Sequence, residues 1–265
     1  MKVDILPLGL MQSDSNNAVL GDTLATVANP NAPHKMNLTP SHAVLIDHPE
    51  AGWILFDTGM PDDPFQVWPK SILDQVICEK PKGTTMVEQL ALVGIRPEDV
   101  KHVIISHMHM DHTGGDHLFA GTADFYVAKE EAAYACRMVL QSPDPADHGW
   151  YIHDDVLLPR KKLMYIDRDE ELFPGVRVVT LPGHTPCVLG LVVHLEGGTL
   201  IFPSDAVADH RNYEGRLPGG VYDSRAYLES LRKVKDIERK FHGAVFFSHD
   251  APQLKKMKLA PAFYE

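Results

Sequence analysis

The sequence predicts an α/β protein of the four-layer α+β kind, an αββα sandwich in which two sheets face each other and helices cover the outside. Two observations favour this fold. Short runs rich in Val, Ile, Leu and Phe recur in both halves of the chain, with helical segments between them. Histidine and aspartate follow several of these runs, so a site along one edge of the sandwich is expected. Residues 1–265 are expected to form one domain, a length that can bury a sizeable core.

The expected strands are short, apolar runs that end at Gly, Pro, Asp or His. They lie near residues 2–8, 42–47, 52–57, 102–106, 124–127, 176–181, 188–194, 199–203 and 244–248.

Helices are expected near residues 85–94, 129–140 and 224–240. The last begins after Ser224, a residue type that caps helices. It places apolar side chains at helical spacing, which predicts that they belong to the core. These side chains are Tyr227, Leu231, Val234 and Ile237.

Composition agrees with a globular enzyme and excludes some functions. Apolar residues make up 44% of the chain. The formal net charge is -11, and no basic cluster is longer than Arg160-Lys161-Lys162, which argues against a nucleic-acid partner. No apolar run approaches the roughly 20 residues that span a bilayer, so no membrane partner is expected.

Two features predict a cytoplasmic location. Met1 to Met11 reads as the start of a strand and not as an export signal. The cysteines, Cys78, Cys136 and Cys187, are odd in number, widely spaced and without a C-x-x-C pair. Neither a disulfide framework nor a zinc knuckle is therefore indicated, and a reducing compartment is the simplest interpretation.

The most informative stretch is Ser106-His107-Met108-His109-Met110-Asp111-His112, which has the pattern H-x-H-x-D-H. His107 and His109 alternate along an extended turn and can reach one metal ion. Asp111 and His112 then turn toward a second ion. Imidazole and carboxylate groups are the ligands that zinc favours at catalytic sites. The alternative, a polar loop that happens to be rich in histidine, is disfavoured because similar residues follow other strands.

Further strand ends carry residues of the same types. In Leu181-Pro182-Gly183-His184-Thr185-Pro186, glycine and two prolines place His184 on a tight turn. Asp205 follows the apolar run Leu200-Ile201-Phe202, and His249 follows Phe246-Phe247-Ser248. A single histidine after a strand is more often structural, but several such strand ends in one chain indicate a metal site.

These blocks resemble those of the metallo-β-lactamase superfamily of dinuclear metallohydrolases, and more closely those of the N-acyl homoserine lactone lactonases. The resemblance covers roughly residues 3 to 255 and includes Leu55-Phe56-Asp57-Thr58-Gly59-Met60-Pro61 and Asn212-Tyr213-Glu214. It implies two divalent metal ions, zinc foremost, with Fe, Mn or Co as alternatives. One ion would be held by His107, His109 and His184, the other by Asp111, His112 and His249, and Asp205 would bridge them.

The same resemblance implies a small-molecule substrate and a quorum-quenching reaction, the ring opening of N-acyl homoserine lactones. A hydroxide shared by the two ions would attack the carbonyl. Asp111 would be the catalytic residue that passes the proton to the leaving alkoxide. No G-x-S-x-G motif for a serine nucleophile is present. The resemblance also suggests a homodimer.

One position departs from the family pattern. Three residues after the bridging aspartate the family usually has a tyrosine that binds the substrate carbonyl, and here this position is Ala208. His210, Tyr213 and Tyr222 are candidate substitutes, although the interpretation favoured for each is an ordinary loop or packing residue.

An acyl chain is expected to lie against Phe65, Trp68 and Met110. The loop that carries Phe65 and Trp68 fits either a lid or a segment packed on the surface. Asp57 fits either support of a ligating imidazole or capping of its own turn. Gly114-Gly115 is expected to let the backbone pass close to the metals.

Two other functions stay open. A hydrolase of the same fold that acts on another lactone, an ester, a thioester or a phosphodiester would carry the same ligands. A redox protein similar to the diiron flavoproteins fits less well, because those generally have a glutamate at the position of His109 and an added flavin domain.

Overall fold

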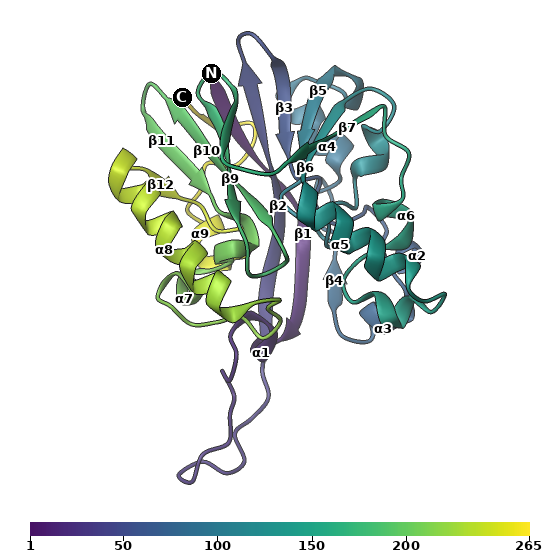
Figure 1. Cartoon of the computed structure of the whole chain (residues 1–265), viewed down its shortest axis with the longest axis vertical. Helices are drawn as coiled ribbons and strands as arrows, with labels where there is room; N and C mark the ends of the chain where they lie inside the picture. Colours follow the sequence, from purple (N-terminus) through teal and green to yellow (C-terminus); the bar gives the residue numbers. More distant parts are fainter.

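Two β-sheets lie face to face in the computed structural model, which describes residues 1–265, and helices cover both outer surfaces (Figure 1). The first sheet has the order β13-β1-β2-β3-β5-β6-β7, with β4 paired to β1, and the second has the order β12-β11-β10-β9-β8. The strands of the first sheet are β1 (Lys2–Asp14), β2 (Met36–His48), β3 (Gly52–Phe56), β4 (Ile77–Glu79), β5 (Val100–Ile104), β6 (Asp124–Ala128), β7 (Lys162–Ile166) and β13 (Phe263–Tyr264). Those of the second are β8 (Glu170–Phe173), β9 (Val176–Leu181), β10 (Val188–Leu195), β11 (Gly198–Phe202) and β12 (Ala244–Val245).

Three longer helices form the outer layers, and short helices lie in the loops. The longer ones are α4 (Met86–Val93), α5 (Lys129–Leu140) and α8 (Ser224–Phe241). The short α-helices are α1 (Ser15–Ala18), α2 (Pro64–Val67), α3 (Lys70–Leu73), α6 (His153–Val156), α7 (His210–Tyr213) and α9 (Ala251–Leu254). Short 3-10 helices span Pro97–Asp99, Asp116–Leu118, Pro145–His148 and Ser204–Val207. No helix combines the length and the apolar composition needed to cross a bilayer.

Side chains that alternate between the two faces of each strand divide the core into layers. In β1, Leu6 and Leu8 pack with residues of α4 and α5, whereas Val3 and Ile5 face the second sheet, because successive side chains of a strand point to opposite faces. On the other side of the molecule, Leu231 of α8 packs against the outer face of the second sheet. The four layers predicted from the sequence are confirmed.

Strand direction brings the expected site residues to one edge. β3 and β5 are parallel and end before Asp57 and Ser106. β10 is antiparallel to both β9 and β11, so these two strands share a direction, and β12 is parallel to β11. The segments after β9, β11 and β12 therefore emerge at a common edge of the second sheet, and they carry His184, Asp205 and His249.

The structure corrects some predicted elements. β1 and β2 are much longer than expected and pair from Lys2↔Asp47 to Asp14↔Met36. Strands β4, β7, β8 and β13 are not predicted by the sequence pattern, because they lie at sheet edges or are too short and largely solvent-exposed to show an apolar signal. β12 is shorter than predicted. The cap of α8 is Asp223, whose carboxylate accepts the Arg225 and Ala226 amides, so Ser224 is instead the first helical residue.

Candidate metal centre

Three imidazoles converge directly after β5 and β9. His107 Nε2 lies 3.1 Å from His109 Nδ1, and His184 Nε2 lies 3.2 Å from the same atom. His107 is fully buried, and the other two rings are largely buried. Nitrogen atoms that meet in this way have no common protein partner, and a cation at their centre would satisfy all three lone pairs.

A second group lies beside the first and mixes imidazole with carboxylate. His249 Nε2 is 3.5 Å from Asp111 Oδ2, and His112 Nε2 is 3.7 Å from the same oxygen. The buried Nε2 of His112 has no hydrogen-bond partner. An orphaned buried nitrogen beside two further ligand-type atoms fits a second cation position.

Asp205 stands between the two groups and offers one oxygen to each. Its Oδ2 lies 3.5 Å from His184 Nε2. Its Oδ1 lies 3.1 Å from His249 Nε2 and 3.5 Å from His112 Nε2. A carboxylate in this position can bridge two ions.

Burial and nearby carboxylates shift the pKa values of the histidines in the two groups in opposite directions. Burial lowers the pKa of His107, His109 and His184, so these rings are neutral and can act as ligands. Burial would also lower the pKa of His112, but Asp111 and Asp205 outweigh it and hold that pKa well above its usual value. The pKa of His249 is raised to about 9 in the same way, against the effect of burial, chiefly by Asp205.

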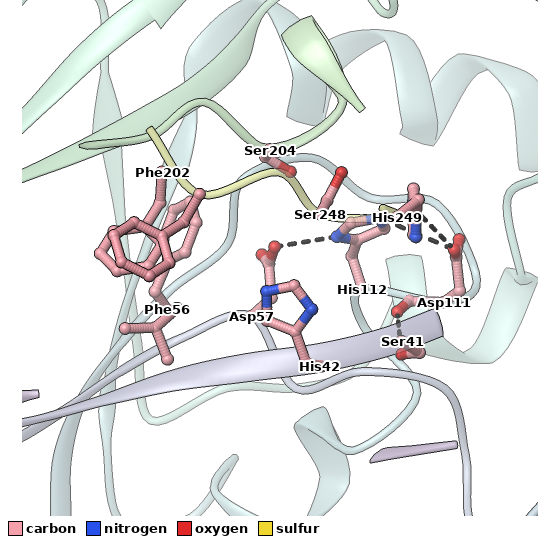
Figure 2. A pocket seen from close by; sticks show the side chains of 12 residues that line it. Ser41, His42, Phe56, Asp57, Asp111, His112, Phe202, Ser204, Ser248 and His249 are labelled. Carbon is pink, nitrogen blue, oxygen red and sulfur yellow. Dashed lines mark hydrogen bonds and ion pairs between the residues drawn. The ribbon is translucent and has the colours of Figure 1, made fainter. Parts of the chain in front are cut away.

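Buried partners orient several of the candidate ligands (Figure 2). Asp57 Oδ2 accepts a hydrogen bond of 2.8 Å from His112 Nδ1, which turns Nε2 toward the centre. His249 Nδ1 donates to the Pro40 carbonyl at 2.8 Å, and Ser248 Oγ donates to Asp205 Oδ1 at 2.7 Å. Of the two interpretations of Asp57, the hydrogen bond therefore favours support of the candidate ligand His112.

Two glycines allow close backbone packing around the centre. Gly183 has φ +137°, and a Cβ there would lie 2.3 Å from Tyr227 N of α8. A Cβ on Gly114 would lie 2.3 Å from Pro61 N. The Gly114 backbone thus packs against the loop after β3.

A cavity of about 160 Å³ opens over the centre. Its lining includes the apolar side chains of Met11, Val76, Met110 and Trp150 and the polar side chains of Ser13, Asn17, Asn37, Thr39, Asp209 and Asn212. The candidate ligands His109, Asp111, His184, Asp205 and His249 also line it, as does Ala208. The cavity can therefore hold a molecule with an apolar chain and a polar head.

The sequence profile of the metallo-beta-lactamase superfamily matches residues 36–249, a range that includes both ligand groups and Asp205. The chain belongs to this superfamily. Together with its named relatives, this membership makes the protein a metal-dependent hydrolase.

Relatives within the superfamily are named for one activity. An N-acyl homoserine lactonase of Bacillus sp is 30% identical over 241 residues, which are 86% of this chain and 92% of that protein. A solved structure of a Bacillus thuringiensis AiiA variant, with N-decanoyl-L-homoserine bound at the active site, aligns with a TM-score of 0.84 and 26% identity over 99% of this chain and 98% of that one. An N-acyl homoserine lactone hydrolase with N-hexanoyl-L-homoserine bound at its catalytic metal centre aligns with a TM-score of 0.83, the same identity and the same coverage.

Two of the residues expected at the substrate pocket of this superfamily member, Met110 and Ala208, do line the cavity. Phe65 and Trp68 do not. Phe65 is 68% exposed on α2, and Trp68 is buried in an apolar cluster with Met60. Both residues lie in the segment after β3, and the local sequence did not show that neither side chain lines the cavity.

The candidate substitutes for the missing tyrosine also lie outside the cavity lining. His210 Nδ1 is 2.6 Å from Asp250 Oδ2, which holds the ring away from the centre. Tyr213 bonds Glu238 of α8. Tyr222 is 57% exposed and packs edge-on against Tyr134.

Several cavity residues were not expected. Met11, Asn37, Val76 and Trp150 line it from β1, β2 and the loops after α3 and α5. None of them lies next to a ligand motif in the sequence, so only strand pairing and loop packing bring them to the site.

Proposed function

We propose that this hydrolase opens the lactone ring of N-acyl homoserine lactones to give N-acyl homoserines, a quorum-quenching reaction. One observation carries the proposal. Two groups of ligand-type residues, joined by Asp205, meet at a cavity that is lined by both apolar and polar side chains. A homoserine lactone offers the matching parts: an ester at one end, an amide next to it, and an alkyl chain. The names of the relatives support the same reaction.

We further propose that the centre holds two divalent cations, zinc before Fe, Mn or Co. His107, His109 and His184 would hold one and Asp111, His112 and His249 the other, with Asp205 shared. Bound there, the ions would supply Lewis acidity and lower the pKa of an attacking water.

Asp111 is the proposed proton carrier. Its side chain is 12% exposed, lines the cavity and lies beside His112 and His249. Ser41 Oγ donates to the Asp111 carbonyl at 3.3 Å, which helps to hold this part of the loop. From this position the carboxylate can take the proton of the attacking water and pass it to the alkoxide that leaves when the ring opens.

The cavity walls are proposed to orient the rest of the substrate. The acyl chain would lie along Met11, Val76, Met110 and Trp150, where its burial removes apolar surface from water. The amide would face the polar side chains that line the cavity, among them Asn37 and Asn212. Ala208 offers no hydroxyl, so no side chain at this position binds the substrate carbonyl.

The absence of that hydroxyl favours a second candidate function, hydrolysis of another lactone or of an ester, thioester or phosphodiester by the same centre. A kinetic screen separates the two. Purified protein would be offered N-acyl homoserine lactones with acyl chains of increasing length, then unrelated lactones, aryl esters, thioesters and a phosphodiester. We expect the highest kcat/KM for an acyl homoserine lactone. Rapid cleavage of another class, with no opening of any acyl homoserine lactone, would overturn the substrate assignment.

Further proposals follow from the rest of the sequence. We propose a single domain over residues 1–265 and a cytoplasmic location, which the free cysteines Cys78, Cys136 and Cys187 support. The net charge of -11 supports the absence of a nucleic-acid partner. A homodimer is proposed from the family resemblance, and light scattering of the purified protein tests it.

A further inference from the structure

Glu131, in the first turn of α5, is a charged residue that is fully buried close to the metal centre without belonging to either ligand group. Its Oε1 accepts a hydrogen bond of 2.9 Å from the amide of Met108. Met108 lies between His107 and His109, so this bond attaches the backbone of the H-x-H segment directly to α5. Burying a carboxylate costs free energy unless it is hydrogen-bonded, so a glutamate at this buried position indicates that its contacts have a role.

The same oxygen also fixes the aromatic ring that packs against His109. Tyr151 donates its hydroxyl to Glu131 Oε1 at 3.1 Å. The rings of Tyr151 and His109 have their centroids 4.9 Å apart and meet edge-on at 66°. Tyr151 is itself buried. Glu131 therefore acts on His109 twice, once through the backbone and once through the neighbouring ring.

The second oxygen of Glu131 is buried and has no hydrogen-bond partner, so both hydrogen bonds of this carboxylate go to Oε1. Burial raises the pKa of Glu131 to about 7. The contacts of the carboxylate thus connect it to the H-x-H segment, through the Met108 amide and through Tyr151.

The other ligand group has separate supports. Asp57 orients His112, and the Pro40 carbonyl orients His249. Neither Asp57 nor Pro40 is among the hydrogen-bond partners of Glu131. Glu131 therefore contacts the first group and not the supports of the second, whereas Ser106 Oγ lies close to both groups, 3.1 Å from His107 Nδ1 and 2.7 Å from Asp57 Oδ2.

We propose that Glu131 is a positioning residue for the triple-histidine metal position, because it holds the segment that carries His107 and His109 through the Met108 amide and through Tyr151. This inference rests on the proposed function, in which these histidines hold one of two ions. Replacing Glu131 should weaken the binding of that ion and leave the ion at Asp111, His112 and His249 nearly unchanged.

Metal titration of purified protein tests the proposal. Metal-free wild type, Glu131→Gln and Glu130→Gln would be titrated with Co²⁺ and followed by the visible spectrum of the bound ion, and Zn²⁺ affinities would be measured by competition with a chromophoric chelator. Glu130 is the exposed neighbour on the same helix, so Glu130→Gln makes the same change of charge as a matched control. We expect Glu131→Gln to lose roughly 10- to 100-fold in affinity for one ion, the size usual for partners of metal ligands, and Glu130→Gln to match wild type.

Double variants identify which ion is affected. In a His184→Ala background, which already removes a ligand of the first group, Glu131→Gln should cause no further loss. In a His249→Ala background it should show its full effect. Tyr151→Phe, which deletes a single donor and keeps the ring, should give a smaller loss at the same ion even if Glu131→Gln folds poorly.

The outcomes are distinct. Equal loss of both ions, or two ions bound with wild-type affinity in Glu131→Gln and Tyr151→Phe, would overturn the positioning role. Failure of wild type itself to bind two ions would instead overturn the proposed function.

Discussion

The carboxylate of Asp57 and the imidazole of His112 form a buried pair in which Oδ2 and Nδ1 are 2.8 Å apart. Asp57 follows β3 with φ of 60°, a left-handed backbone conformation that is uncommon for residues other than glycine. Its carboxylate also accepts the amide and the hydroxyl of Ser106, each at 2.7 Å. One carboxylate thus joins the ends of two neighbouring parallel strands and fixes the side of His112 that faces the centre.

Asp57→Asn is expected to weaken the binding of the ion at Asp111, His112 and His249. An amide in place of the carboxylate loses the charge that favours the Nδ1-protonated imidazole of His112. Affinity for one of two ions should fall by roughly 10- to 100-fold, measured by chelator competition. Asp236→Asn, on the exposed face of α8, is the control with the same chemical change. Unchanged stoichiometry and affinity in Asp57→Asn would contradict this role.

Asp205→Ala is expected to damage both metal positions. This carboxylate directs one oxygen to each ligand group, so its removal would leave two cations without their shared anion. Elemental analysis should find fewer than two ions per chain after dialysis, together with a loss of hydrolysis. Full activity with two ions retained would show that Asp205 does not bridge them.

Asp111→Asn is expected to lower turnover more than metal content. The amide keeps an oxygen that can contact a cation, but it cannot carry a proton. General acid-base steps typically contribute about 10²- to 10⁴-fold in rate, so kcat should fall within that range while elemental analysis still finds two ions. A variant that binds both ions and turns over within a few-fold of wild type would make Asp111 a structural ligand alone.

Met110→Ala is expected to reduce the preference for long acyl chains. Met110 is one of the apolar side chains that line the cavity. Each methylene of the acyl chain that is buried there contributes up to about 0.8 kcal/mol to binding. The ratio of kcat/KM between a long-chain and a short-chain lactone should therefore fall in the variant. Phe65→Ala is the control, because this exposed side chain does not line the cavity. A loss of chain-length preference in Phe65→Ala, and none in Met110→Ala, would show instead that the loop after β3 closes over the acyl chain.

The contribution of Asp155 to stability is expected to fall as pH rises from about 4 to about 7. Burial, together with the nearby Asp116, raises the pKa of Asp155 from 3.8 to about 7. Folding therefore favours the neutral acid, and this contribution is fully present below pH 3.8 and is lost as pH rises through 7. In the Asp155→Asn variant, stability should depend less steeply on pH over this range. Each kcal/mol of the lost dependence corresponds to roughly 3 °C in melting temperature. Parallel melting curves for the variant and wild type at every pH would refute the assignment.

The sequence predicted the layers of this fold well, because apolar periodicity reports which side chains must leave water. Val3 and Ile5 alternate with Asp4 and Leu6, and the helix over 224–241 carries Tyr227 and Leu231 at core spacing. Edge strands escaped prediction for the same reason. β7 and β8 bury few side chains and so carry little of the signal that the prediction uses.

The candidate ligand residues, which the structure brings together, could also be recognised from the sequence. His107, His109, Asp111 and His112 lie within one loop, and His184, Asp205 and His249 each follow an apolar strand. A metal site needs several ligands within a few ångströms, and here the candidate ligands occur in short blocks at strand ends. These blocks meet because the strands that precede them end at the same edge of the sandwich.

Tertiary structure determines which residues line the proposed substrate cavity. Trp68 and Tyr213 were expected there from their nearness to the motifs, yet Trp68 is buried in an apolar cluster and Tyr213 is bonded to α8. Met11, Asn37 and Trp150 reach the cavity from distant parts of the chain. The fold class and the candidate metal ligands could be predicted from the sequence alone, because both depend on local patterns. The shape of the cavity depends on which side chains long-range pairing and packing turn inward, and no local pattern records that choice.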